Sequence, residues 1–419
     1  MTQQQRRSLY NEQLTAFDRL CAADLSLDLT RGKPASEQLD LSNALLALPG
    51  DDDYIAADGS DVRNYGQPRG LRELREIFSP ILQVPPEQIV AGENASLAMM
   101  HDCLVHALLV GTPDSAKPWA HEDRVAFLCP VPGYDRHFAL CEQYGIEMIP
   151  VDLHDDGPDM DQVRSHITDP AVKGMWLVPT YANPTGAVIS EDVAAELAAL
   201  DTAATDFRIM WDNAYAVHHL GDEHAKTPDI LGLSVAAGNP NRPLIFASTS
   251  KITFAGAGVC FLGGSEINID WYVRHMSKRT IGPDKVNQLR HARFLGDTDG
   301  VRALMDKHRA ILAPKFDLVT ETLARRLGDY QFASWTRPRG GYFVSLDVMD
   351  GTASRVVELC RQAGIAMTPA GAAYPYGHDP HDRTIRIAPS YPPLEELRTA
   401  IDGLCTCVLL AATEASMEA

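Results

Sequence analysis

The chain has 419 residues, of which 45% are hydrophobic and 22% are charged, a composition typical of a soluble globular protein. Its formal charge of −19 argues against nucleic acid or an anionic membrane as a partner. One hydrophobic core serves roughly 250–300 residues at most, so we expect two domains. The polar N-terminus lacks a signal peptide, and no apolar run approaches the roughly 18 residues of a membrane helix, so we expect a cytoplasmic protein. The eight cysteines and the acidic runs show no metal-ligand spacing, so we expect no metal site.

Short apolar runs alternate with helical patterns over the first 300 residues or so. Helical patterns include 95–110 and 191–204. The apolar runs are nearly continuous, as expected for strands that are covered on both faces. We therefore predict an α/β fold whose large domain, residues 51–299, has a mainly parallel seven-stranded sheet between helices. The seven predicted strands are 88–92, 124–130, 146–151, 174–180, 207–212, 244–249 and 259–264.

The pattern changes at a long helical stretch over 300–327. Strand-like segments follow in "GGYFVSLDV", "IAMTP" and "RTIRIAPS", with a helix in "ASRVVELCRQAG" and a final helix from Pro393 to about Leu410. This order is typical of an α+β unit. We assign residues 300–419 to a smaller C-terminal domain.

Ligands of parallel sheets bind beyond the carboxyl ends of the strands, so the residues that follow each strand are informative. Asn94, Ala95 and Ser96 begin a helix, whose free N–H groups suit a phosphate, although Asn94 or Ser96 could simply cap the helix. Tyr134 follows the next strand and could stack on a flat ring or fill the core.

Asn183 precedes a proline that restricts its backbone, so its amide is either a fixed hydrogen-bond donor or part of a turn. Asp212 ends an apolar strand and needs a cation or a donor, unless it caps a helix. Tyr215 lies three residues further on and can point to the same side as Asp212. Trp211 would point to the opposite side, into the core.

Lys251 follows Ser248 in a Ser/Thr cluster with almost no other polar neighbours. A dry pocket lowers the pKa of a lysine and makes it a nucleophile, whereas a surface lysine would stay charged. Together the strand-end residues describe pyridoxal phosphate, which needs a lysine for its aldehyde and an acid for its ring nitrogen. The remaining groups are a phosphate site (Asn94, Ala95, Ser96, Ser248), a stacking ring (Tyr134) and partners for the phenolic oxygen (Asn183, Tyr215).

Five motifs stand in a familiar order: "NYGQPRGLRELREIF", "YANPTGAVIS", "DNAY", "STSK" and "RIAPSYP". On these motifs the chain resembles, from about residue 29 to 392, the fold type I (class I) aminotransferases of the aspartate aminotransferase superfamily. Within that superfamily it is similar to the MocR-like or subgroup Ic bacterial aspartate aminotransferases. The resemblance implies a pyridoxal-phosphate-dependent homodimer with active sites at the subunit interface. It also implies ping-pong transfer of an amino group from aspartate to 2-oxoglutarate.

The resemblance implies a role for each matching residue. Lys251 would form the Schiff base with the cofactor and then move protons, and Arg386 would clamp the substrate α-carboxylate. Tyr65 would reach the cofactor phosphate of the neighbouring subunit. Gly32 would close over the substrate, as part of an N-terminal segment, residues 1–50, that packs with the small domain. The other implied cofactor contacts are Asp212 on the pyridinium, Asn183 and Tyr215 on the ring oxygen, Tyr134 on the ring face, and Ser248 with Asn94–Ser96 on the phosphate.

The chain departs from the family at one position, because Val259 stands where many members have a phosphate-binding arginine, eight residues after the lysine. An aspartate side chain also needs a second cation. The candidates are Arg31, Lys33, Lys285 and Arg290, each of which could instead be a surface charge.

Other functions remain open at this stage. An alanine, aromatic or branched-chain aminotransferase would keep every cofactor residue, and a lyase or decarboxylase could use the same fold. A MocR-type transcription regulator would need an additional DNA-binding module before residue 29. We interpret His218 and His219, which follow the "DNAY" motif, as packing or solvent-facing residues.

Overall fold

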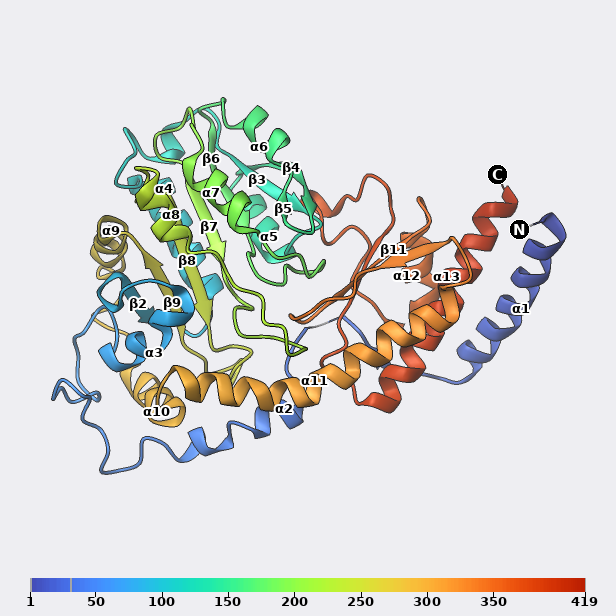
Figure 1. Ribbon diagram of the computed structural model, residues 1–419, viewed down its shortest axis with the longest axis horizontal. Coiled ribbons are helices and arrows are strands. Elements are labelled where there is room, and N and C mark those ends of the chain that lie inside the picture. Colours follow the sequence, from blue (N-terminus) through green and yellow to red (C-terminus); the bar gives the residue numbers. More distant parts are fainter. Residues whose placement is uncertain (1, 31, 419) are drawn as a thin grey trace.

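The computed structural model describes residues 2–30 and 32–418, and a large mixed sheet forms its centre (Figure 1). All seven predicted strands are present in the sheet, and a two-residue strand, β5, extends one edge beyond the expected number. The first seven strands in the order all run parallel except β9, which is antiparallel to both neighbours. The order is β2 (Ile89–Gly92), β9 (Cys260–Gly264), β8 (Pro243–Ser248), β7 (Arg208–Asp212), β6 (Val172–Leu177), β3 (Ala126–Val131), β4 (Glu147–His154) and β5 (Gly157–Pro158).

Helices cover both faces of this sheet, which explains why its central strands are apolar throughout. Successive side chains of a strand point to opposite faces, so Met210 and Trp211 of β7 belong to two different hydrophobic clusters. One face packs on α4 (Ser96–Val110), α5 (Asp135–Gln143) and α9 (Glu266–Met276). The other packs on α3 (Arg72–Leu82), α6 (Met160–His166), α7 (Glu191–Ala199), α8 (Ile230–Ala236) and α10 (Lys285–Leu295).

A second, smaller unit surrounds a three-stranded antiparallel sheet in the order β10–β11–β13. The long helix α11 runs from beneath the large sheet into this unit (Figure 1). A third hydrophobic cluster joins its strands and helices, and it includes Phe17 and Leu29 from the N-terminal segment. The elements are β10 (Ala333–Trp335), β11 (Val344–Val348), β12 (Ile365–Ala366), β13 (Thr384–Ile387), α11 (Thr298–Leu327), α12 (Ala353–Gln362) and α13 (Leu394–Glu418).

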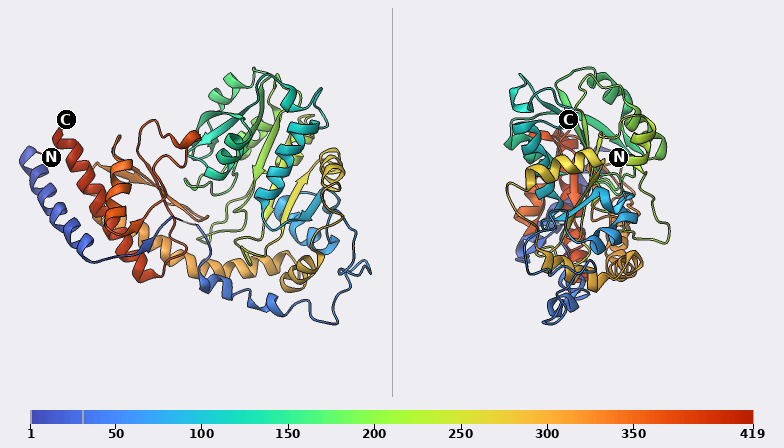
Figure 2. Two further views of the ribbon diagram at one scale, coloured as in Figure 1. Left: turned by 180° about the vertical axis from the view of Figure 1, so that it is seen from behind. Right: turned by 90° about the vertical axis from the view of Figure 1, so that its left-hand side faces the viewer.

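The N-terminal segment contributes α1 (Gln3–Ala22), β1 (Leu27–Asp28) and α2 (Ser36–Asp40). Helix α1 lies along α13, and the two chain ends lie at the same end of the molecule (Figure 2). Strand β1 pairs in parallel with β12 of the small unit. The segment thereby joins the C-terminal part of the chain in space.

Several elements differ from the sequence-based expectations. Helix α1 was not predicted, because Leu9 and Phe17 are its only buried apolar residues. Helix α7 ends at Ala199, five residues before the predicted end, because Leu200 leaves the helical conformation with φ −49° and ψ 133°. Helix α13 continues to Glu418 instead of ending near Leu410.

The expectation that nothing resembles a membrane span also needs correction. Among the described residues, Leu394–Met417 is long and apolar enough to cross a membrane by length and composition alone. The stretch contains no long uninterrupted apolar run, because polar residues divide it. However, 72% of its apolar window is buried, as in the core helix of a folded domain.

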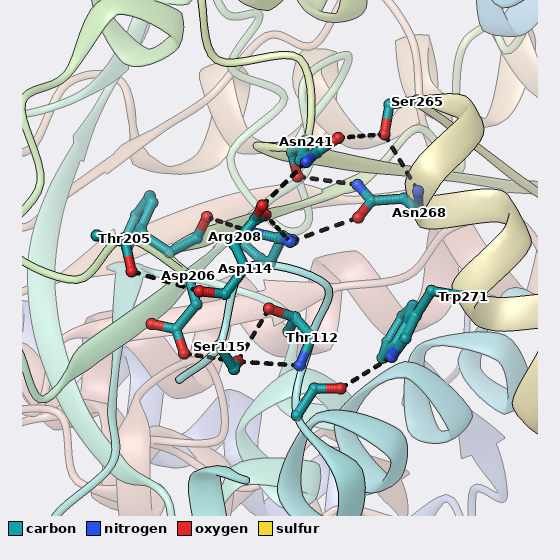
Figure 3. Close-up of polar contacts among 12 residues, drawn as sticks. Thr112, Asp114, Ser115, Thr205, Asp206, Arg208, Asn241, Ser265, Asn268 and Trp271 are labelled. Atoms are coloured by element: carbon teal, nitrogen blue, oxygen red, sulfur yellow. Dashed lines mark hydrogen bonds and ion pairs between the residues drawn. The ribbon is translucent and has the colours of Figure 1, made fainter. Parts of the chain in front are cut away.

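The amino end of β7 is fixed by a buried polar network (Figure 3). Arg208, the first residue of the strand, pairs with Asp114 and donates to Asn268 Oδ1 at 3.4 Å. Asp206 accepts from Lys173 Nζ at 2.9 Å and from Trp119 Nε1 at 2.8 Å. These bonds tie the loop after α4 to the start of the strand whose other end is Asp212.

Candidate active site

The predicted site residues gather at the carboxyl ends of the strands. Asp212 is the last residue of β7, and Ser248 is the last residue of β8, three positions before Lys251. Tyr134 is the N-cap of α5 after β3, and Asn183 lies in the loop after β6. The parallel strands thus bring together, at their carboxyl ends, residues that are more than 100 positions apart in the sequence.

Asp212 is the most informative of these groups. It is only 3% exposed, and its Oδ2 lies 3.0 Å from His137 Nε2. The His137 ring stacks on Trp176 with centroids 4.3 Å apart, which fixes the imidazole. The other oxygen, Oδ1, is buried and has no hydrogen-bond partner among the described residues. A buried carboxylate oxygen is costly unless a donor satisfies it, so this oxygen fits the protonated nitrogen of a flat heterocycle.

Lys251 lies near this carboxylate, in a turn that follows β8. Burial lowers the pKa of the Lys251 amine, and the negative charge of Asp212 partly offsets that effect. The Nζ atom lies 5.2 Å from the ring centroid of Tyr215 and 5.9 Å from that of Tyr342. The amine therefore lies among aromatic side chains, and its loss of solvation on burial favours the neutral, nucleophilic form.

Two tyrosines line the same region. Tyr215 is 4% exposed, and burial, with the nearby Tyr134 and Asp212, raises its pKa well above the usual value. Burial, followed by the charge of Asp212, raises the pKa of Tyr134 to about 12. Both phenols therefore keep their protons at neutral pH and can act as hydrogen-bond donors.

Arg386 of β13 brings the small unit to the site. Its Nη1 donates to Asp135 Oδ1 at 3.0 Å and to Asn183 Oδ1 at 3.4 Å, and the guanidinium lies 5.0 Å from the Phe343 ring centroid. Its Nε is buried without a partner among the described residues. One edge of the guanidinium is thus held by protein, and its Nε can donate to a bound carboxylate.

Gly32 approaches the same place from the N-terminal segment. A Cβ atom on Gly32 would lie 2.3 Å from Cζ of Phe343, the ring beneath Arg386. Any side chain would therefore displace that ring, which explains the glycine.

The predicted phosphate residues also meet. Ser248 Oγ donates to Ser250 Oγ at 3.1 Å, and Ser250 Oγ donates to the Asn94 carbonyl at 3.5 Å. Ala95 is the N-cap of α4 and offers no capping side chain, so the first turn of that helix can direct its N–H groups at an anion. Val259, where the family resemblance led us to look for an arginine, is 1% exposed and donates its N–H to Thr249 Oγ1.

Comparisons with known proteins agree with this geometry. The family model described as "Aspartate amino-transferase" matches residues 1–419. The chain belongs to the aspartate aminotransferase family. An aspartate aminotransferase of Corynebacterium glutamicum is 56% identical over 411 residues, which are 98% of this chain and 95% of that one.

Solved structures show the same fold. The crystal structure of an aspartate transaminase from Corynebacterium glutamicum has a TM-score of 0.97 at 54% identity and covers 99% of this chain and 98% of that one. LysN, an α-aminoadipate aminotransferase of Thermus thermophilus, shares the fold with a TM-score of 0.75 at 19% identity over 93% of each chain. LysN was solved with N-(5'-phosphopyridoxyl)-L-leucine, a pyridoxal phosphate derivative. The present chain is an aminotransferase, and aminotransferases of this fold use pyridoxal phosphate.

One predicted site residue lies apart from the others in this aminotransferase. Tyr65 is 81% exposed, on a loop that lines a hollow of about 480 Å³ together with Lys285 and residues 282–284. Lys285 donates to the carbonyls of Asn64 at 2.6 Å and Gly66 at 2.9 Å. Those bonds hold the loop and occupy the ammonium group.

The other residues that could bind the carboxylate of an aspartate substrate's side chain differ in their surroundings. Lys33 Nζ lies 3.8 Å from the ring centroid of Tyr391. Arg290 donates from Nε to Asn287 Oδ1 at 2.7 Å and lines a hollow of about 470 Å³ that also includes Asn94 and residues 256–259. Arg31 lies outside the described residues.

The sequence analysis missed His137 and Asp135. Both follow Tyr134 within one helical turn, at positions that can point back to the end of the sheet. Their short distance from Tyr134 in the sequence could have marked them as site residues.

Proposed function

We propose that this aminotransferase uses pyridoxal phosphate to transfer the amino group of aspartate to 2-oxoglutarate. The observation that carries the cofactor assignment is the buried, unpartnered Oδ1 of Asp212 beside a lysine whose pKa burial lowers. The donor assignment is supported by the 56% identical relative named aspartate aminotransferase, because the cofactor residues alone do not select a donor.

Bound pyridoxal phosphate supplies an electron sink for the bonds at the substrate α-carbon. Asp212 keeps the ring nitrogen protonated, and His137 holds Asp212 in place. Asn183 and Tyr215 donate to the ring oxygen, and Tyr134 packs on the ring. Ser248 and the Asn94–Ser96 turn bind the phosphate.

Lys251 has two roles in this proposal. It would first hold the cofactor through Nζ. Once the substrate amine has replaced it, the freed amine would take the proton from the substrate α-carbon and deliver it to the cofactor carbon that carried the aldehyde. A lowered pKa serves both roles, because a larger fraction of the amine is neutral near pH 7.

Arg386 binds the α-carboxylate of the substrate, and its contact with Asp135 orients the planar group. Gly32 and the rest of residues 1–50 close over the bound substrate and pack with the small domain, residues 300–419. We assign the cofactor-binding domain to residues 51–299. For the second carboxylate we favour Arg290 or Lys33 over Lys285, whose ammonium already bonds two backbone carbonyls.

We further propose a homodimer, located in the cytoplasm, in which Tyr65 reaches the cofactor phosphate of the second subunit. Exposed apolar side chains that gather on one surface mark sites of protein–protein contact. Ile281 and Val286 are also exposed, at 62% and 40%, and they flank residues 282–285, which line the same hollow as Tyr65. An interface over these residues would cover them.

The test is steady-state kinetics with a panel of donors and 2-oxoglutarate as acceptor. The proposal predicts parallel double-reciprocal lines and the highest kcat/KM with L-aspartate, with no turnover by Lys251→Ala. A higher kcat/KM for alanine, aromatic or branched-chain donors would reject the donor. Release of ammonia or CO2 without amino transfer would reject the reaction.

A further inference from the structure

Three buried histidines contact the turn that carries Lys251. His308 Nε2 lies 2.9 Å from the carbonyl of Ile252, and His218 Nε2 lies 3.4 Å from the carbonyl of Lys251. His291 Nε2 lies 2.9 Å from the hydroxyl of Thr253. Three consecutive residues of the turn are thus each held by a different histidine.

The histidines come from three separate parts of the chain. His218 follows the "DNAY" motif, His291 is on α10, and His308 is on α11. They are 3%, 0% and 0% exposed, respectively. Among the described residues, no backbone N–H donates to the carbonyl of Lys251 or Ile252, so the histidines provide their hydrogen bonds.

The protonation state of His308 follows from its second partner. The carbonyl oxygen of Gln38 accepts from the Ala35 N–H at 3.1 Å, so its amide nitrogen faces His308 Nδ1 at 3.0 Å. An amide nitrogen only donates, so Nδ1 accepts, and the ring proton is on Nε2, where it bonds Ile252. Burial also lowers the pKa of His308, which keeps this ring neutral.

The pKa values of the other two histidines, His218 and His291, are also lowered. Burial, followed by the charge of Lys251, lowers the pKa of His218 well below its usual value, and His308 and His219 act in the same direction. Burial lowers the pKa of His291 to about 4, and the charge of Arg290 lowers it further. The bond to the Asn287 carbonyl and the charge of Asp284 act in the opposite direction. Three neutral rings therefore surround the turn at pH 7.

We propose that His308, assisted by His218 and His291, positions Lys251 by fixing the backbone of residues 251–253. This inference rests on the proposed role of Lys251. His218, which the sequence analysis treated as packing or solvent-facing, is therefore a positioning residue. Gln38 also donates to the Tyr342 hydroxyl at 2.9 Å, so the network joins the N-terminal segment to the lysine turn.

The experiment compares His308→Leu, His308→Gln and His218→Phe with wild type. Glutamine retains an N–H that can reach Ile252, and phenylalanine retains the packing of His218 on Tyr215 and Tyr342. His106→Leu is the control, because His106 is a half-buried histidine of α4 packed on Trp271 and Tyr272, away from the turn.

The first readout uses the apoprotein. Acetic anhydride labels neutral amines, so the pH profile of Lys251 labelling, measured by peptide mass spectrometry, gives its pKa. We expect His308→Leu and His218→Phe to raise the midpoint by on the order of half a pH unit, because a loosened turn admits water to the amine. The glutamine variant and the His106 control should match wild type.

The second readout uses the holoenzyme. We expect the two disruptive variants to lower kcat about three- to tenfold, the value of one hydrogen bond, with KM for aspartate nearly unchanged. Unchanged labelling profiles and kcat, with only a lower unfolding temperature, would overturn the proposal. If His308→Leu does not fold, His218→Phe decides the question by the same criteria. If the wild type neither binds pyridoxal phosphate nor transaminates, the proposed function fails, whereas the apoprotein labelling still tests the positioning.

Discussion

Asp212 uses only one of its two carboxylate oxygens within the protein: Oδ2 lies 3.0 Å from His137 Nε2, whereas Oδ1 is buried without a partner among the described residues. A folded protein seldom leaves a carboxylate in this state unless a ligand completes it. In the proposed site, Asp212 and His137 supply one half of this contact, and a cationic donor such as a pyridinium nitrogen supplies the other half.

The first prediction concerns this carboxylate. Asp212→Asn keeps the shape but cannot hold the ring nitrogen protonated. Losing one partner of a buried ion pair costs about 3–5 kcal/mol, so kcat should fall by roughly two to four powers of ten. His137→Asn, which removes only the support, should cost about tenfold. Equal losses in the two variants would show that Asp212 has no direct contact with the cofactor.

The second prediction concerns substrate binding. Arg386→Lys removes the planar, two-pronged donor, so KM for aspartate should rise about 10- to 100-fold, the worth of a hydrogen bond to a charged group. Uptake of pyridoxal phosphate, followed by fluorescence, should be unchanged. Asp135→Asn leaves the arginine in place and should raise KM only a few-fold. An unchanged KM in Arg386→Lys would show that the substrate α-carboxylate binds to another residue.

Much of this site could be predicted because its residues stand directly after strands. The strands themselves were recognisable, since both faces of the sheet are covered and the runs are apolar throughout. His308 and His291 gave no such signal, because they lie on helices 56 and 38 positions, respectively, from the residues that they contact. Only the folded chain shows that these helices pass beside the lysine turn.

The fold likewise contains elements that the sequence did not reveal. Strand β10 has three residues and α1 buries little apolar surface, so neither has a strong periodic pattern. Strand β10 is stabilised by pairing with the next strand, β11, and α1 is stabilised by α13 at the other end of the chain. Local sequence patterns do not report such contacts.

The third prediction concerns the dimer. In a mixed dimer of Lys251→Ala and Tyr65→Ala subunits, one site carries both substitutions and the other carries neither. If both variants are inactive alone, random reassembly of equal amounts should restore about one quarter of wild-type activity. Mixing two samples of one variant is the control. No recovery, although subunit exchange is shown by mass, would mean that Tyr65 does not act across the interface.

The fourth prediction concerns stability. Asp206 is buried with Lys173, Ser115 and Trp119, so Asp206→Ala should lower the free energy of unfolding by about 3–5 kcal/mol. The exposed pair of Arg302 and Asp299 is the control, and Arg302→Ala should leave the unfolding midpoint unchanged. Urea unfolding followed by circular dichroism gives both values. Similar effects of the two substitutions would contradict the role of the buried network.

The pH dependence of the same group gives a fifth prediction. Burial raises the pKa of Asp206, but the hydrogen bonds from Lys173, Ser115 and Trp119 outweigh it, and the pKa is lowered overall. A lowered folded-state pKa contributes stability that is complete above the unfolded value of about 3.9 and is lost as the pH falls through the folded value. The stability difference between wild type and Asp206→Asn should therefore be constant near neutral pH and shrink below about pH 4. A difference that grows in acid would contradict this.

The most direct test of the central claim is an absorbance spectrum of the purified protein with pyridoxal phosphate, beside Lys251→Ala. We predict a cofactor absorbance band near the visible edge. L-aspartate should remove this band and 2-oxoglutarate should restore it. The Lys251→Ala protein should lack this band. A protein that shows no such band after incubation with pyridoxal phosphate, or a variant whose spectrum equals that of wild type, would contradict the account.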